Sequence, residues 1–326
     1  MRAVRYERYG GPDRLRPVDA AVPVPGPGQV LVKVSASSVN SWDWDLLRGS
    51  ALARIGAARR PAHPVLGADV SGEVVAVGAG GDGAAGFAVG DAVWGDLSAA
   101  GWAGFAEFVA TDAGALRRRP AGVDPIEAAA IPQAGGLAWQ SLVDVAALRA
   151  GERVLVVGAA GGAGTIAVQL ARHLGAGEVV AVDRAAKLDL LRGIGATETV
   201  EADAAAELFA EGVGSGRFDV IVDLVAGRAL ADYRRALRPG GRFVVVGGRL
   251  RTIGRVAATA GRPDAEGRTF RLLAAEPNGG LGELGELVAS GVLAPVIEEV
   301  LPLERVPEAL ARIGAGTVLG KLVIAP

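Results

Sequence analysis

A buried strand, a glycine-rich turn and the start of a helix follow one another in Val154-Leu-Val-Val-Gly-Ala-Ala-Gly-Gly-Ala-Gly-Thr-Ile-Ala-Val-Gln-Leu-Ala171. Such a turn is typical of dinucleotide-binding folds, where glycines let the backbone approach a pyrophosphate. Ala159 stands where the first glycine of this fingerprint usually falls, and Gly161 and Gly164 follow it. The free N–H groups and the dipole of the helix N-terminus favour a bound phosphate. The residues expected to contact the dinucleotide here are Ala160, Gly161, Gly162 and Ala163.

Wholly apolar strands flank this turn along the chain. They are expected at Arg153–Val157, Glu178–Val182, Phe218–Val222 and Arg242–Val246. Runs of Val and Ile without polar alternation indicate strands buried on both faces of a parallel sheet. Amphipathic stretches such as 165–174 and 228–237 lie between them. The region therefore predicts a doubly wound α/β domain.

The N-terminal third has a different rhythm. Short β-branched runs separated by Gly, Pro and Asp occur at Gln29–Val34, Gly72–Val77, Asp91–Trp94 and Phe105–Val109. This spacing favours an antiparallel, barrel-like domain. A last run, Gly320–Ile324, predicts a strand that rejoins it. We expect residues 1–122 and 266–326 to form this domain, and residues 123–265 to form the α/β domain.

Asp183 ends the second apolar strand, 19 residues after Gly164 (183 − 164). An acidic residue at this place accepts hydrogen bonds from the adenine ribose and favours NAD over NADP. A carboxylate about 4 Å from a 2′-phosphate costs about 4 kcal/mol per charge pair at an effective dielectric near 20. Arg184 and Lys187 are positioned in sequence to offset part of that repulsion, so NADP stays open. The alternative role of Asp183 is to cap the helix that follows.

Composition excludes several classes of protein. The 326 residues carry 34 basic and 36 acidic side chains, a balance that argues against a nucleic-acid partner. The absence of cysteine excludes disulfides, thiolate nucleophiles and cysteine-ligated zinc. Met1–Tyr9 lacks the apolar segment of a signal peptide, and no apolar run approaches the roughly 20 residues that span a bilayer. We expect a cytoplasmic protein without a membrane partner.

Several motifs in order resemble the medium-chain dehydrogenase/reductase superfamily, and more narrowly its zinc-free quinone-oxidoreductase branch. Besides the turn, they are Pro25–Val32, Ser38–Asn40, Pro64–Gly72, Val89–Val93 and Gly104–Phe108. The resemblance covers nearly the whole chain. It implies a GroES-like β-barrel catalytic domain plus a Rossmann doubly wound parallel-sheet domain, an active site between them, and a homodimer.

The resemblance also predicts whether a metal is bound and which reaction is catalysed. Zinc-dependent relatives have a zinc-binding Cys at the position of Asn40 and a His in the motif that here reads Gly67-Ala68-Asp69. Both ligands are missing, so no zinc is expected. The branch implies hydride transfer from NADH or NADPH to a small-molecule conjugated carbonyl, an enone or a quinone. Asn40 is then the candidate donor to the carbonyl oxygen. Its alternative role is an Asx turn that caps the helix starting near Ser41.

Other positions depart from the family pattern. Asp45 stands where relatives often have Tyr or His, and is either a general acid or a solvated carboxylate. Leu137 replaces a Thr that contacts the nicotinamide in relatives. Either backbone groups near Gly247 and Gly248 cover the loss, or the cofactor geometry is relaxed or redox activity is reduced. Ala202 replaces a Tyr that binds NADP.

The candidates for lining the substrate pocket are Trp42, Trp44, Phe270 and Asn278. Each is alternatively a core or rim residue. Two other functions stay open beside reduction of a conjugated carbonyl. One is a reductase or dehydrogenase of simple ketones, aldehydes or alcohols. The other is a non-redox cofactor-binding or tailoring protein on the same fold.

Overall fold

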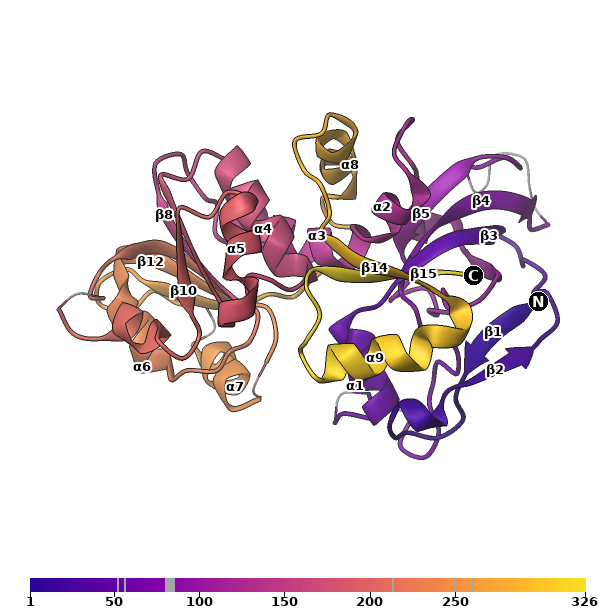
Figure 1. Ribbon diagram of the computed structural model, residues 1–326, viewed down its shortest axis with the longest axis horizontal. Coiled ribbons are helices and arrows are strands. Elements are labelled where there is room, and N and C mark those ends of the chain that lie inside the picture. Colours follow the sequence, from indigo (N-terminus) through magenta and orange to yellow (C-terminus); the bar gives the residue numbers. More distant parts are fainter. Residues whose placement is uncertain (52, 56, 80–85, 213, 249, 260) are drawn as a thin grey trace. The chain divides into compact units, whose positions relative to one another are not determined.

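A computed structural model of the chain is drawn in Figure 1. It describes residues 1–51, 53–55, 57–79, 86–212, 214–248, 250–259 and 261–326. The chain divides into two compact units, Met1–Gln133 with Gly280–Pro326, and Ala134–Gly279. Each helix in the described part of the chain is too short or too polar to cross a membrane.

The first unit is built on a seven-stranded sheet in which most neighbours are antiparallel. The order is β14-β15-β3-β4-β5-β7, and β6 also pairs with β3. The strands are β3 (Gln29–Ser38), β4 (Asp69–Val77), β5 (Ala92–Asp96), β6 (Phe108–Asp112), β7 (Arg117–Arg118), β14 (Ile297–Pro302) and β15 (Lys321–Ala325). A separate antiparallel pair is formed by β1 (Arg2–Arg5) and β2 (Arg16–Asp19). The expected C-terminal strand is confirmed, because β15 pairs antiparallel with β3.

Short helices surround this sheet. They are α1 (Ser41–Arg48), α2 (Pro125–Ala129), α8 (Leu281–Ala289) and α9 (Val306–Gly314), with single turns η1 (Pro12–Arg14), η2 (Ala113–Ala115) and η6 (Leu303–Arg305). The helix α2 begins as its sequence predicts, since Asp124 accepts a hydrogen bond from the backbone N–H of Ile126 and Pro125 occupies the first turn. One apolar core lies between α1, α9 and the first strand pair, and includes Leu47, Leu310 and Ile324.

The second unit contains a six-stranded sheet in which all neighbours are parallel (Figure 1). Its order is β10-β9-β8-β11-β12-β13. The strands are β8 (Arg153–Val157), β9 (Glu178–Asp183), β10 (Glu198–Glu201), β11 (Phe218–Asp223), β12 (Leu237–Val245) and β13 (Thr269–Leu272). This is the strand order of a doubly wound α/β sheet, the class of domain expected from the sequence, and the strand order reverses between β8 and β11.

The helices of the second unit follow the expected βα alternation. They are α4 (Gly162–His173), α5 (Leu188–Gly193), α6 (Leu230–Ala236) and α7 (Leu250–Ala258), with shorter turns η3 (Gln140–Val145, a π-helix), η4 (Ala185–Lys187) and η5 (Ala205–Phe209). The helix α3 (Pro132–Trp139) begins in the first unit and continues in the second. Ile166, Leu170 and Ala171 are buried on one face of α4, which packs against β8 and β9.

The units divide later in the chain than the expected boundaries 122/123 and 265/266. Residues after 122 stay with the first unit because α2 packs on β3 and β4, and because the backbone N–H of Gln133 donates to Asp69. Residues after 265 stay with the second unit because β13 pairs with β12, from Arg242 opposite Thr269 to Val245 opposite Leu272.

Candidate active site

The turn after β8 has the geometry that a bound pyrophosphate needs. Gly158 adopts φ +79°, and Gly161 is the extended residue that precedes α4. A Cβ on Gly164 would lie 2.4 Å from the carbonyl oxygen of Gly158, so only glycine lets the helix pack this closely on the turn. A Cβ on Gly161 would meet only that same oxygen, at 3.7 Å. The backbone at Gly161 is therefore open to an approaching ligand, and the residues of this turn fit the pyrophosphate of a dinucleotide.

Two residues of this turn, Ala159 and Ala160, are enclosed by the fold. Gly158, directly after the strand, has the left-handed conformation, whereas Ala159 is buried completely. Ala160 is also buried, and its N–H donates to Asp183 at 2.8 Å instead of remaining free. Gly162 and Ala163 are half-buried at the first turn of α4, where N–H groups have no partner within the helix. The N–H of Gly161 donates to the carbonyl of Gly158 at 3.3 Å, so the candidate phosphate-binding N–H groups are those of Gly162 and Ala163.

Asp183 lies at the carboxyl end of β9 beside this turn. One carboxylate oxygen accepts from Ala160, and the other accepts from the N–H of Arg184 at 2.8 Å. The side chain does not cap the following helix, because η4 begins after Arg184 without a side-chain cap. Arg184 is exposed and Lys187 is half-buried on the same segment. The structure therefore brings the three candidate ribose-binding and phosphate-binding side chains together at one strand end.

The loops after β11 and β12 complete this edge of the sheet. Gly248 has φ +113°, and a Cβ there would lie 2.0 Å from the carbonyl oxygen of Val225. A Cβ on Gly247 would have no neighbour within 4 Å, so this backbone is accessible. Asp223, a residue that the sequence analysis missed, is buried and accepts from Val225 and Ala226, both at 2.7 Å. Burial raises the pKa of its carboxyl.

Ligands of open α/β sheets bind at the carboxyl ends of the strands, near the point where the strand order reverses. The fingerprint turn, Asp183 and Gly247 all lie at that edge. A depression of about 450 Å³ opens at the opposite edge, where β8, β9 and β10 begin. It is lined by Gly151, Arg153, Gly177, Glu178, Thr197 and Glu198. Its position argues against a role in binding the dinucleotide.

In the first unit, Asn40 belongs to a buried polar cluster. Its side chain is held at both ends, since its Oδ1 accepts from Lys321 Nζ at 2.5 Å and its Nδ2 donates to Asp69 Oδ2 at 2.9 Å. Ser38 Oγ donates to the same Asp69 oxygen at 2.6 Å. Strand pairing creates the cluster, because Ser38 lies opposite both Asp69 and Val323. Asn40 is 7% exposed and Lys321 is 3% exposed.

A second buried carboxylate, Asp43, fixes the start of α1. It accepts from the N–H of Asn40 and from the N–H of Gly67, each at 2.8 Å. Burial raises the pKa of Asp43 to about 7, although these two hydrogen bonds oppose the rise. Burial and the charge of Asp69 likewise raise the pKa of Asp96 to about 6. The Asn40 amide therefore lies among several buried ionisable groups.

Asn40 was predicted from the sequence as a site residue, whereas Asp43, Asp69 and Lys321 were not. Two signals were available in the sequence. Asp69 is an isolated acidic residue at the head of an apolar run, and Lys321 is one of only three lysines in the chain. The contact between Lys321 and Asn40 joins residues 281 positions apart, so local patterns did not reveal it.

Asp45 lies outside this cluster. It is exposed on α1, and partial burial raises its pKa. Trp42 is 49% exposed, and its ring meets that of Trp102 edge-on with centroids 5.7 Å apart. Trp44 is half-buried against α9, where a Cβ on Gly314 would lie 2.5 Å from the indole ring. Of the two tryptophans, Trp42 has surface left for a ligand, whereas Trp44 packs against α9.

The other two expected pocket residues lie in the second unit. The expectation that Phe270 lines the substrate pocket is wrong. Phe270 is 1% exposed in β13, and its ring packs against that of Phe243 with centroids 6.1 Å apart. The sheet core occupies its side chain, so it does not line a pocket. Asn278 is half-buried with φ +62°. Its segment is anchored by Gln140, whose side chain exchanges two hydrogen bonds with the backbone of Glu276.

Known families match both parts of the chain. Residues 26–121 match the alcohol dehydrogenase GroES-like domain, and residues 194–324 match a family described as zinc-binding dehydrogenase. The residues at the two positions where zinc-dependent relatives have zinc ligands do not fit zinc. Asn40 Oδ1 already accepts from the Lys321 ammonium, and Ala68 offers no ligand atom. Among the described residues, no three His, Cys, Asp or Glu side chains are placed to hold a metal ion.

Individual relatives span the same region. The chain is 36% identical over 304 residues to polyketide synthase GfsB of Streptomyces halstedii. The matched region covers 91% of this chain but only 5% of that much longer protein. It is 31% identical to the quinone oxidoreductase of Homo sapiens, over 99% of this chain and 97% of the relative. The structure of the quinone oxidoreductase from Coxiella burnetii superposes with a TM-score of 0.86 at 29% identity, covering 100% of this chain and 99% of the other. The expected resemblance is confirmed: the chain belongs to the medium-chain dehydrogenase/reductase superfamily, in its quinone-oxidoreductase-like branch.

Proposed function

We propose that the protein is an NAD(P)H-dependent oxidoreductase that reduces a conjugated carbonyl, an enone or a quinone, and that it prefers NADH. The observation that carries the proposal is the turn after β8, with Gly161 open to a ligand and Asp183 beside it. The likeness to quinone oxidoreductases over nearly the full chain supports the same class of reaction. The bound cofactor would supply the hydride.

The cofactor-binding groups follow from the geometry of the second unit. The N–H groups of Gly162 and Ala163 would hold the pyrophosphate at the positive end of the α4 dipole, and Gly161 would let it approach the backbone. Asp183 would accept from the adenine ribose while keeping its two backbone bonds, since each carboxylate oxygen has a second lone pair. The accessible backbone at Gly247 would meet the nicotinamide carboxamide.

NADH is preferred because a 2′-phosphate would face the Asp183 carboxylate. That repulsion is about 4 kcal/mol for one pair of charges at about 4 Å and an effective dielectric near 20. Arg184 is exposed and offers the opposite charge, so it determines how much of the preference remains. The preference between the two cofactors is therefore a balance between these neighbouring residues.

Asn40 would stabilise the charge that develops on the substrate. Hydride addition to the β-carbon of an enone moves an electron pair toward the carbonyl oxygen, where a fixed donor contributes about 3 to 4 kcal/mol. The Asn40 Nδ2 group has two hydrogens, and the structure assigns one of them to Asp69. The second hydrogen is the donor for the substrate oxygen.

A non-redox role on the same fold is the second candidate, and Leu137 favours it. This half-buried residue of α3 replaces a hydrogen-bonding side chain with an aliphatic one. A protein of this kind would bind the dinucleotide and transfer no hydride. The expected homodimer and cytoplasmic location remain predictions.

The first experiment titrates NADH and NADPH separately against the purified protein and follows the thermal midpoint. A ligand at 100 times its dissociation constant adds about 2.7 kcal/mol to stability. A larger shift with NADH is expected, and a larger shift with NADPH would assign the decisive role to Arg184 and Lys187. No shift with either cofactor would reject the proposal. Binding without oxidation by any quinone or enone would favour the non-redox role, and analysis of an enone product separates C=C from C=O reduction.

A further inference from the structure

The orientation of the Asn40 amide is determined by its two charged neighbours. Lys321 has only donor hydrogens, so the atom that faces it at 2.5 Å must be the amide oxygen. Asp69, when ionised, only accepts, so the atom that faces it at 2.9 Å must be the amide nitrogen. A flipped amide would place donors against the ammonium and the oxygen against the carboxylate. A single orientation is therefore stable, with one Nδ2 hydrogen left for a ligand.

Lys321 is held in place by burial and charge. Its ammonium lies 3.4 Å from Asp69 Oδ2, and the two side chains are 3% and 0% exposed. Asp69 also accepts from Ser38 and from the backbone of Gln133, so it cannot turn away from the cluster without losing several bonds. Burial lowers the pKa of Lys321, while the charges of Asp69 and Asp43 oppose that change.

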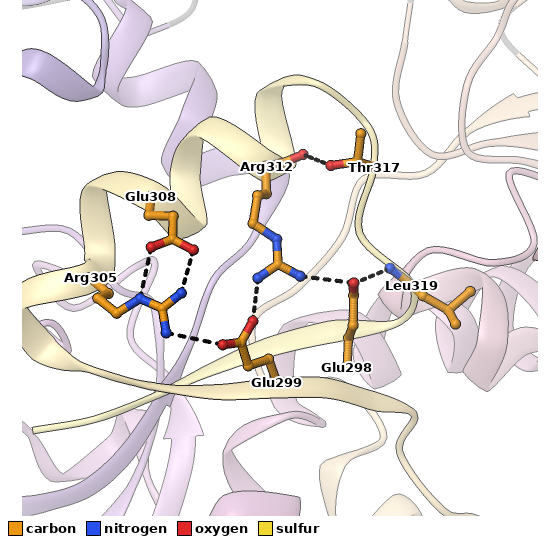
Figure 2. Close-up of polar contacts among 7 residues, drawn as sticks. All are labelled: Glu298, Glu299, Arg305, Glu308, Arg312, Thr317 and Leu319. Carbon is orange, nitrogen blue, oxygen red and sulfur yellow. Dashed lines mark hydrogen bonds and ion pairs between the residues drawn. The ribbon is translucent and has the colours of Figure 1, made fainter.

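The backbone that carries Lys321 is fixed on both sides. Gly320 has φ +69°, and a Cβ there would lie 2.2 Å from the carbonyl oxygen of Val296, so this position requires glycine. The N–H of Lys321 donates to that same carbonyl at 2.9 Å. Figure 2 shows the side chains that anchor the turn before it: Glu298 accepts from the N–H of Leu319 at 2.6 Å and from Arg312 at 2.8 Å.

This network also ties the helix α9 to β14. Arg312 bridges Glu298 and Glu299, and Arg305 bridges Glu299 and Glu308 (Figure 2). Two arginines and three carboxylates thus connect the strand beside β15 with the helix that covers it. The start of β15, which carries Lys321, is therefore connected to β14 and, through Glu298 and Arg312, to α9.

We propose that Lys321 is a positioning residue for carbonyl reduction: it clamps the Asn40 amide so that one Nδ2 hydrogen is presented to the substrate oxygen. Its charge also polarises that hydrogen, because an amide whose oxygen accepts from a cation becomes a stronger donor. The inference rests on the proposed function. The bound cofactor would supply hydride to the β-carbon, the C=C electron pair would shift to form an enolate, and a proton from water would then bond to the α-carbon.

The activity test uses a double-mutant cycle on the full chain. Lys321→Met is expected to lower kcat for an enone about 10- to 100-fold, by analogy with the loss found when the hydrogen-bond partner that orients a metal-binding side chain is removed. KM changes less than kcat, and NADH affinity is unchanged because the cofactor groups lie in the other unit. In an Asn40→Ala background, Lys321→Met is expected to change kcat less than about twofold, since residues that act as a unit are not additive. Lys33→Met, on an exposed lysine of β3, is the matched control and leaves kcat unchanged.

If Lys321 had only a structural role, Lys321→Met would lower kcat by the same factor in the wild type and in the Asn40→Ala variant. That result overturns the proposal. A second measurement covers the case in which this variant does not fold. The chain has only two asparagines, Asn40 and Asn278, so selective ¹⁵N labelling of their side-chain amides gives two resolvable groups. Because Lys321 on the amide oxygen keeps the amide from flipping, the Asn40 hydrogen that donates to Asp69 is expected to be protected from exchange in the wild type. Rapid exchange of both hydrogens contradicts the clamp. If the clamp is present but no acceptor is reduced, the proposed function fails, and with it the role of Lys321.

Discussion

The carboxylate of Asp183, at the end of β9, accepts a hydrogen bond from the backbone N–H of Ala160 at 2.8 Å. The residue that would bind the ribose therefore also ties two neighbouring strand ends together, because Ala160 belongs to the turn after β8. Its second oxygen accepts from the N–H of Arg184 at 2.8 Å. A change at this position affects the shape of the turn as well as the choice of cofactor.

Asp183→Asn is expected to reduce both the stability and the discrimination between cofactors. An amide has one acceptor atom where the carboxylate has two, so one backbone N–H loses its partner at a cost of about 1–3 kcal/mol. Loss of the negative charge removes the repulsion toward a 2′-phosphate, so the ratio of NADPH to NADH affinity rises. Urea denaturation and separate cofactor titrations measure the two effects. Asp189→Asn, on the exposed face of α5, is the control and leaves the ratio unchanged. An unaltered ratio in Asp183→Asn would mean that the carboxylate does not meet the ribose.

Gly164→Ala is expected to destabilise the second unit and to abolish cofactor binding. The new Cβ would lie 2.4 Å from the Gly158 carbonyl oxygen, which is backbone and has little freedom to move. Overpacking of this kind costs about 1–3 kcal/mol. Gly193→Ala is the control, because a Cβ at this exposed end of α5 meets nothing within 4 Å. Equal denaturation midpoints for the two variants would contradict the close packing of α4 on the turn.

Features written in short stretches of sequence were predicted well. The turn after β8, the four apolar strands of the parallel sheet and the C-terminal strand each depend on local patterns of sequence, and the structure contains all of them. Features that depend on tertiary packing were not predicted from the sequence. Phe270 has the composition of either a pocket or a core residue, and only its neighbours in the folded sheet place it in the core. Lys321 reaches Asn40 through a pairing of strands that are remote in sequence.

Buried carboxyl groups predict an unusual dependence of stability on pH. The pKa of Asp43 is raised to about 7 in the folded chain, whereas an unfolded Asp ionises near 3.9. Between these values the folded state holds a proton that the unfolded state has lost, so the free energy of unfolding falls as pH rises. The slope for one such group is at most about 1.4 kcal/mol per pH unit. Asp96, with a pKa raised to about 6, adds to the fall in the lower part of this window.

Asp43→Asn tests this assignment through the slope. The variant loses one acceptor for the N–H groups of Asn40 and Gly67, which lowers stability by an amount that does not vary with pH. Urea denaturation at intervals from pH 5 to 7 is expected to give a steeper decline in the wild type than in the variant. Asp13→Asn, an exposed substitution in the same unit, keeps the wild-type slope. Parallel curves for the wild type and Asp43→Asn would show that Asp43 is already ionised at pH 5.

Asp69 is the residue whose loss should cost the most stability in the polar cluster. It accepts from Ser38, Asn40, Lys321 and the backbone of Gln133, so Asp69→Ala leaves a buried ammonium and several donors without this acceptor. Removing one partner of a buried ion pair costs about 3–5 kcal/mol. Lys321→Met removes a single donor from a carboxylate that keeps its other bonds, so we expect it to cost less than Asp69→Ala.

Urea denaturation of the two variants compares these costs directly. Glu304→Gln is the reference for an ordinary surface pair, because it breaks the exposed contact with Arg2 and should change stability little. A larger loss for Lys321→Met than for Asp69→Ala would mean that the lysine, through packing of its aliphatic stem, holds the cluster together. A larger loss for Asp69→Ala, which we expect, means that Asp69 is the acceptor that holds the other polar groups of the cluster together. The main role of the Lys321 ammonium is then to orient the Asn40 amide.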